Sequence, residues 1–286
     1  MLSPRSLEVW LHAPREEHDP LVRELIAPLS AEISAEPSLA ALFFGRYNKP
    51  DWHLRLRVLG EAEWLEGALR PRLERALGRE RERGGLRGFE YAEYERELER
   101  YGGEEGLGLA ERVFHYDTRA CLELLDAEQR GLCAKTRREH CLLTTERYLD
   151  LLDFTRDERL TFYRYAYSFE IDLGRWGDEE QQALEQHYRG IKDGLLALLR
   201  GETRDDGERS WGGTEPARIA TEYLAAIAPL LGKLRAGQAA GRIRRGRVDL
   251  AWALTHMHCN RLQVEADAEA ILRFFMHRLH AEEELA

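Results

Sequence analysis

Three basic side chains alternate with aliphatic ones in the segment 53–59, which reads HLRLRVL. In an extended strand, His53, Arg55 and Arg57 lie on one face and the aliphatic residues between them on the other. The two arginines stand roughly 7 Å apart along the backbone, and their planar guanidinium groups suit two-pronged capture of a carboxylate or phosphate. The pattern therefore predicts either an anion-binding face or the solvent-facing side of an antiparallel sheet, where arginine is common.

A second group of reactive residue types lies near the C-terminus, in the segment 255–262, THMHCNRL. His256 and Asn260 share one face of a predicted helix, whereas His258 points elsewhere. A two-histidine metal site on a helix uses i, i+4 spacing, and the four cysteines form no CxxC pair, so we expect no bound metal. Two interpretations of His256 remain open, a hydrogen-bonded core residue and a general acid or base.

The segment 97–103, ELERYGG, places Glu97 and Arg100 three residues apart ahead of two glycines. Such a pattern is typical of a salt-bridged element that ends at glycine. Arg100 could equally add a third cation to an anion-binding site. The spacing alone does not separate these two interpretations.

Composition limits the classes of function. The chain has 286 residues and a formal net charge of −10, which argues against general nucleic-acid binding because phosphate contacts need a basic surface. The N-terminus lacks a basic segment followed by an apolar one, and no run of 18 apolar residues occurs. We therefore expect a cytoplasmic protein with neither a secretion signal nor a membrane span.

Periodicity predicts the elements that position these residues. Segments 6–12, 42–47 and 53–59 alternate as strands, and the last two form a hairpin around 48–51. Segments 19–33 and 61–77 have helical apolar spacing. Segment 91–101 fits a strand or a helix, and as a strand it would complete the ferredoxin-like split βαβ order.

From residue 106 onward the apolar spacing is helical almost throughout. The expected helices cover 107–125, 127–153, 157–173, 179–200, 216–236 and 247–281, with a polar loop at 201–213. We therefore predict an α+β fold in one unit, 1–286. A small antiparallel sheet with its helices forms 1–103, and a mostly helical layer forms 104–286.

Four motifs carry a family resemblance: FFGRYNKPDWHLRLR at 43–57, ELERYGG at 97–103, VFHYDT at 113–118 and THMHCNRL at 255–262. In this order they resemble the C-terminal, glutamate-elimination domain of lantibiotic dehydratases and the freestanding thiopeptide-type bacteriocin biosynthesis proteins. The resemblance extends from Trp10 to about Leu262. It implies that a partner esterifies Ser or Thr of a precursor peptide with glutamate from glutamyl-tRNA. This domain then expels the glutamate and leaves dehydroalanine or dehydrobutyrine.

The resemblance also implies which residues form the elimination site, and their chemistry agrees with it. A histidine can remove the α-proton of the esterified residue, and arginines can stabilise the departing carboxylate. The predicted catalytic residues are His256, Arg57 and Arg100, and the predicted substrate-binding residues are Arg55, Glu97, His53 and Asn260. The motif match favours His256 over His258 as the acid or base.

The expected partners follow from the same resemblance. The chain is too short to include a glutamylating domain, so we expect a separate tRNA-dependent glutamylating protein, a glutamylated precursor peptide with leader and core, and no cofactor or direct contact with nucleic acid. The leader would lie along an exposed strand edge. Whether the protein is a monomer or a homodimer stays open.

Two other functions remain as alternatives. Freestanding relatives catalyse a formal [4+2] cycloaddition between two dehydroalanines and thereby act as pyridine synthases. The chain could also be a non-catalytic subunit that presents the peptide to a partner enzyme. Retention of several arginines together with His256 favours elimination over both, because these cations suit a departing carboxylate.

Overall fold

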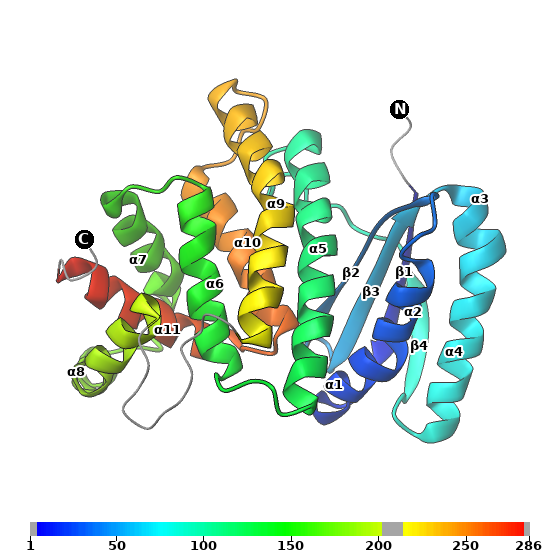
Figure 1. Ribbon diagram of the computed structural model, residues 1–286, viewed down its shortest axis with the longest axis horizontal. Coiled ribbons are helices and arrows are strands. Elements are labelled where there is room, and N and C mark those ends of the chain that lie inside the picture. Colours follow the sequence, from blue (N-terminus) through cyan, green and yellow to red (C-terminus); the bar gives the residue numbers. More distant parts are fainter. Residues whose placement is uncertain (1–4, 202–213, 283–286) are drawn as a thin grey trace.

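The computed structural model describes residues 5–201 and 214–282 and shows a small sheet beside a large group of helices (Figure 1). The strands are β1 (Arg5–His12), β2 (Leu39–Tyr47), β3 (His53–Gly60) and β4 (Gly88–Ala92). They form one sheet in the order β2-β3-β1-β4, and each neighbouring pair is antiparallel. The predicted hairpin of β2 and β3 is confirmed, and β1 pairs with the second strand of this hairpin.

Two helical segments cover one face of the sheet (Figure 1). The first contains α1 (His18–Leu21), a π-helical turn (Val22–Ile26) and α2 (Ala27–Ile33), and the second contains α3 (Ala62–Trp64), a π-helical turn (Leu65–Leu69) and α4 (Arg70–Arg83). Leu54, Leu56 and Val58 of β3 are fully buried in the core beneath these helices. The aliphatic half of the strand's alternation therefore determines which face receives them.

The remaining helices lie on the other side of the sheet, where α5 and α10 contact β2. They are α5 (Glu104–Gln129), α6 (Arg137–Leu151), α7 (Arg156–Asp172), α8 (Asp178–Arg200), α9 (Glu215–Ala239), α10 (Arg247–Arg261) and α11 (Ala266–Ala281). A small antiparallel sheet followed by a mostly helical part is thus confirmed. Among the described helices, none has the length and apolar character needed to cross a bilayer.

Strand β2 contributes to two hydrophobic cores. Leu42 and Phe44 pack with the helices α1 to α4 on one face of the sheet. Phe43, between them, packs with the helical part on the other face. The alternation of a single strand therefore joins both parts of the chain.

Three predicted elements are wrong in their extent. The helix expected at 127–153 begins only at Arg137, because Thr136 and Glu139 form a capping box that starts a new helix after α5 has ended. The helix expected at 247–281 is two helices, and Gln263 between them has a left-handed φ of 59°. The segment 91–101 is neither strand nor helix beyond Ala92. After its first residue, the polar loop at 201–213 lies outside the described residues.

Candidate active site

The basic face of β3 is covered rather than solvated. His53 is fully buried and Arg57 is 9% exposed. Only Arg55, between them, is half-buried. The prediction of a solvent-facing sheet surface is therefore wrong for two of the three basic residues, because side chains of the neighbouring strands pack around them: Trp10 and Tyr47 on His53, and Glu8 and Tyr47 on Arg57.

Arg57 forms a buried ion pair with Glu8 on the neighbouring strand. Its Nε donates to the Glu8 carboxylate at 2.6 Å, and the indole Nε1 of Trp10 donates to the same carboxylate at 2.6 Å. Arg57 Nη1 also donates to the Tyr47 hydroxyl at 3.4 Å. Burial opposes the charge of Arg57, but Tyr47 and Glu8 outweigh it and hold its pKa above the ordinary value. The guanidinium is therefore a fixed cation whose charge is largely balanced by Glu8.

Arg55 is clamped between two aromatic rings. Its guanidinium carbon lies 4.0 Å from the ring centroids of both Trp10 and Tyr47. Its Nε donates to His53 Nε2 at 3.0 Å. Across residues 5–201 and 214–282, no carboxylate forms an ion pair with this guanidinium. Arg55 is thus held in place by stacking and retains donors for an anion.

His53 orients Arg55 by accepting a hydrogen bond from its guanidinium. Its Nδ1 donates to the backbone carbonyl of Asp51 at 2.7 Å, which leaves Nε2 as the acceptor for Arg55. Burial lowers the pKa of His53, so the ring stays neutral and keeps this tautomer. Because the ring is fully buried, it orients an arginine and presents no atom to a ligand.

Arg100 enters the site from a glycine turn before α5. Gly102 has a φ of +78°, and a Cβ added there would lie 2.7 Å from Ile243 Cγ2, so glycine satisfies both the backbone conformation and the packing. Arg100 Nη1 donates to the Glu97 carboxylate at 3.0 Å, and its guanidinium carbon lies 5.7 Å from the ring centroid of Trp252 on α10. The turn therefore directs Arg100 towards α10.

His256 contacts the same tryptophan. Its ring stacks on Trp252 with centroids 5.1 Å apart and 10° between the planes. The side chain is 26% exposed, and its Nδ1 lies 2.7 Å from the Glu269 carboxylate of α11. Glu269 in turn pairs with Arg273 at 3.1 Å. Trp252 thus links Arg100 to a half-buried histidine that has a carboxylate on one ring nitrogen only.

Tyr47 connects the two groups of residues. It touches Arg55 and Arg57 through its ring and hydroxyl, and a Cβ added at Gly45 would lie 3.1 Å from its ring and 3.4 Å from the side chain of Met257. Burial opposes the charge of Arg100, but Tyr101 and Glu97, with a smaller contribution from Tyr47, outweigh it and raise the pKa of Arg100. The sheet face and α10 therefore meet at this ring.

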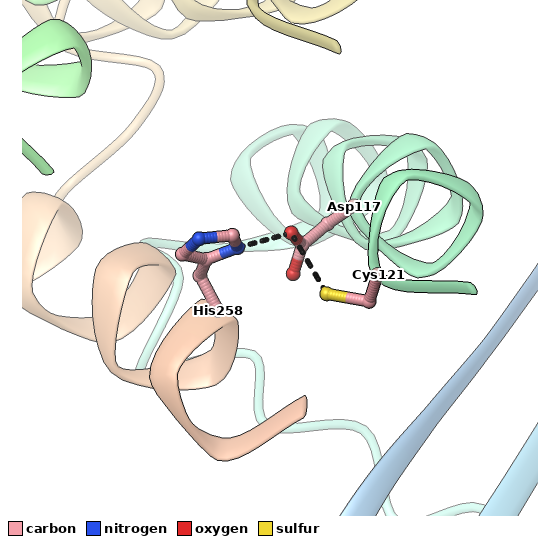
Figure 2. A group of neighbouring side chains, drawn as sticks. All are labelled: Asp117, Cys121 and His258. Atoms are coloured by element: carbon pink, nitrogen blue, oxygen red, sulfur yellow. Dashed lines mark hydrogen bonds and ion pairs between the residues drawn. The ribbon is translucent and has the colours of Figure 1, made fainter. Parts of the chain in front are cut away.

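His258 belongs to a different, buried network (Figure 2). Its Nδ1 lies 2.6 Å from one oxygen of Asp117, and Arg261 Nη1 lies 2.6 Å from the other. Burial raises the pKa of Asp117, but His258 and Arg261 outweigh it and lower the pKa below its usual value. Cys121 adds its thiol at 3.8 Å. His258 is 5% exposed and so is oriented into the protein, away from Trp252 and His256.

These residues also form the one cluster in the described chain with metal-ligand geometry. The ligand atoms of Asp117, Cys121 and His258 lie within 4.8 Å of one another, a proximity that the cysteine spacing did not predict. A cation there would stand beside the guanidinium of Arg261, which already balances Asp117. The donor set therefore fits a buried ion-pair network better than a metal centre.

Asn260 closes the outer edge of β2. Its Oδ1 accepts from the backbone N–H of Arg46 at 2.8 Å, and its Nδ2 donates to the carbonyl of the same residue at 2.7 Å. The amide thus occupies both backbone groups that an added strand would use. His115 Nδ1 lies 3.1 Å from the backbone nitrogen of Leu42 on the same edge. With both amide groups engaged, Asn260 fixes α10 to the sheet.

Replacing Asn260 by alanine should destabilise the fold by about 1–3 kcal/mol, because a buried N–H and a carbonyl lose their partners. Urea unfolding measures this change. Asn260→Asp keeps the acceptor for the N–H and loses the donor, so it should fall between the wild type and alanine. A wild-type midpoint for Asn260→Ala would show that water replaces both bonds.

Four residues at this site were not predicted from the sequence. Glu8 and Trp10 lie on the polar face of β1, and their partners in the antiparallel register are Arg57 and Arg55. That register could have identified both, since the alternation of β1 is visible in the sequence. Tyr47 could have been found in the same way. Glu269 gave no signal, because it lies on a separate helix that was not distinguished from α10.

The family model "Lantibiotic biosynthesis dehydratase C-term" matches residues 6–280 of this chain. The subtilin biosynthesis protein SpaB of Bacillus subtilis is 30% identical over 156 residues, which are 54% of this chain and 15% of SpaB.

Two solved structures are similar to this fold, each with a TM-score of 0.71. The tRNA dependent lantibiotic dehydratase MibB from Microbispora sp. 107891 has 22% identity, and the match covers 100% of this chain and 28% of MibB. TbtD, the pyridine synthase from thiomuracin biosynthesis, has 18% identity, and the match covers 97% of this chain and 98% of TbtD. The chain thus spans a small part of SpaB and MibB and nearly all of TbtD. Since the family model covers almost the whole sequence, the protein belongs to the lantibiotic biosynthesis dehydratase C-terminal family.

Proposed function

We propose that this protein eliminates glutamate from glutamylated Ser or Thr residues of a ribosomal precursor peptide. The observation that carries the proposal is the pairing of an anion site with a base. Arg55 is held between two rings without a carboxylate partner in the described chain. His256, reached through Arg100 and Trp252, has a carboxylate on one nitrogen only. A β-elimination needs both features.

In the proposed reaction, Nε2 of His256 removes the α-proton of the esterified residue. The electrons of the Cα–H bond form the Cα=Cβ double bond, and the Cβ–O bond breaks so that glutamate leaves as a carboxylate. Atoms and charge balance without a cofactor: the histidine gains the proton and the glutamate gains the electron pair. The product residue is dehydroalanine or dehydrobutyrine.

The three arginines have different parts in this proposal. Arg55 is the principal anchor of the departing glutamate, since its charge is not balanced by a carboxylate among the described residues. The charge of Arg57 is balanced by Glu8, so Arg57 contributes a fixed hydrogen-bond donor next to Arg55. Arg100 is paired with Glu97, whose side chain is 52% exposed, so this pair is accessible to the amine and carboxylate of the glutamate.

Two predicted substrate contacts have other roles in this proposal. His53 positions Arg55, and Asn260 holds α10 against β2. The partners are a precursor peptide and a separate protein that glutamylates it. The similarity to MibB supports a tRNA-dependent partner reaction, because MibB is a tRNA dependent lantibiotic dehydratase. This chain corresponds to 28% of MibB.

A second candidate is the pyridine synthase reaction, because TbtD matches over nearly the full length of both chains. A cycloaddition joins two dehydroalanines and has no departing glutamate. The unpaired charge of Arg55 and the Glu97–Arg100 pair favour elimination over this reaction.

The deciding experiment is mass spectrometry of a glutamylated precursor peptide incubated with this protein alone, without tRNA or ATP. Release of free glutamate with one dehydrated residue for each glutamate lost would establish elimination. A glutamyl peptide that stays intact, beside a dehydroalanine peptide that is cyclised, would establish the pyridine synthase. Inertness towards both peptides, with binding retained, would instead identify a presenting subunit.

A further inference from the structure

A buried carboxylate lies behind the proposed base and has no part in the reaction described so far. Glu269 is 3% exposed and sits on α11, one helix away from His256. Its Oε2 lies 2.7 Å from His256 Nδ1, and its Oε1 lies 3.1 Å from Arg273 Nη2. Each carboxylate oxygen therefore has one dedicated partner.

The surroundings keep this carboxylate ionised. Burial raises the pKa of Glu269, but the charges and hydrogen bonds of His256 and Arg273 outweigh it and lower the pKa to about 2. An anionic oxygen accepts hydrogen bonds and cannot donate them. The ring nitrogen that faces Glu269 must therefore carry a proton.

The other charged and titratable groups in this region do not compete for Nδ1. Arg273 faces Cys259 of α10 at 3.8 Å and lies over the rings of Phe162 and Tyr163 of α7. The guanidinium carbon of Arg100 lies 5.7 Å from the ring centroid of Trp252. None of these groups offers an acceptor to His256.

We infer that Glu269 is a positioning residue that fixes His256 as the Nδ1–H tautomer and thereby leaves Nε2 unprotonated as the base. The hydrogen bonds from Arg273 to Glu269 and between Glu269 and His256 fix the Nδ1 edge of the imidazole ring, and stacking on Trp252 fixes the plane of that ring. When Nε2 takes the α-proton, the proton on Nδ1 stays in place and the carboxylate stabilises the imidazolium. Glu269 contacts no substrate. This inference rests on the proposed function only for its catalytic consequence.

The test compares the wild-type protein with a double variant and with a control variant. Glu269→Gln alone leaves Arg273 buried without its carboxylate and can unfold the protein. The double variant Glu269→Gln/Arg273→Met removes both charges and retains packing. The matched control is Glu146→Gln, which alters a second glutamate–histidine pair, Glu146–His280, whose side chains are 16% and 7% exposed.

The first readout is the ¹⁵N spectrum of the neutral His256 ring, assigned with His256→Gln. We expect the wild type and the control to carry the proton on Nδ1. In the double variant, the amide of residue 269 can donate to Nδ1, so the proton should shift wholly or partly to Nε2. The inference would be overturned by a proton on Nε2 in the wild type, or by a proton that stays wholly on Nδ1 in the double variant.

The second readout is the rate of glutamate elimination. We expect kcat of the double variant to fall by about 10²-fold or more, with KM for the glutamylated peptide nearly unchanged. A switched tautomer with a normal kcat would overturn the catalytic role. If the double variant shifts its tautomer as expected but the wild type eliminates no glutamate, the proposed function is refuted, while the assignment of Glu269 to the proton of His256 stands.

Discussion

Replacing His256 by alanine should lower the rate of glutamate elimination by on the order of 10²–10⁴-fold, the usual contribution of a positioned general base. The fold should tolerate the change. His256 is 26% exposed, and Glu269 keeps Arg273 as a partner. The affinity for the glutamylated peptide should also change little, since the predicted anchors lie on β3 and at the turn before α5.

Single-turnover assays with glutamylated peptide separate this loss of rate from a loss of binding. His277→Ala is a suitable control, because this histidine lies on α11 with its Nδ1 3.2 Å from the Tyr167 hydroxyl. Equal elimination rates for His256→Ala and the wild type would mean that another group removes the proton.

Replacing Glu8 by alanine should reduce the free energy of unfolding by about 3–5 kcal/mol, because it leaves the guanidinium of Arg57 buried without a counter-charge. The two side chains are only 2% and 10% exposed, so water cannot readily replace the carboxylate. The indole N–H of Trp10 loses its acceptor as well. Trp10 and Arg57 both border Arg55, so elimination should also weaken.

Urea unfolding monitored by circular dichroism gives the stability change. The double variant Glu8→Leu/Arg57→Met should recover most of the lost stability, since it removes both charges and keeps the volume. It should not recover elimination. A loss below about 1 kcal/mol for Glu8→Ala would show that Arg57 reaches solvent.

Much of the fold was predictable because strand alternation is a local signal. The side of β3 that became the core and the side that carries the basic residues both followed from alternate positions. The helical character of the chain after residue 104 was predictable because apolar spacing along a helix is also a local signal. The boundaries of the helices were not, because the start of α6 depends on Thr136 and Glu139, and the break before α11 depends on the backbone of Gln263.

The candidate site was predicted in part. The sequence identified arginines and a histidine as the chemical groups, but it could not show how each charge is balanced. Arg57 has Glu8 as a partner, whereas Arg55 has two rings and a neutral histidine. This difference arises from the pairing of strands that are far apart in the sequence. The same limit applies to Asn260, whose partner lies 214 residues away.

The double use of strand β2 has a consequence for how the protein unfolds. Leu42 and Phe44 are buried in one core, and Phe43 is buried in the other. Melting of either core would expose one side of the same strand, at roughly 1.5–3 kcal/mol for each large side chain. The two parts of the chain are therefore expected to lose structure in a single cooperative transition, and the first hundred residues would not be stable when expressed alone.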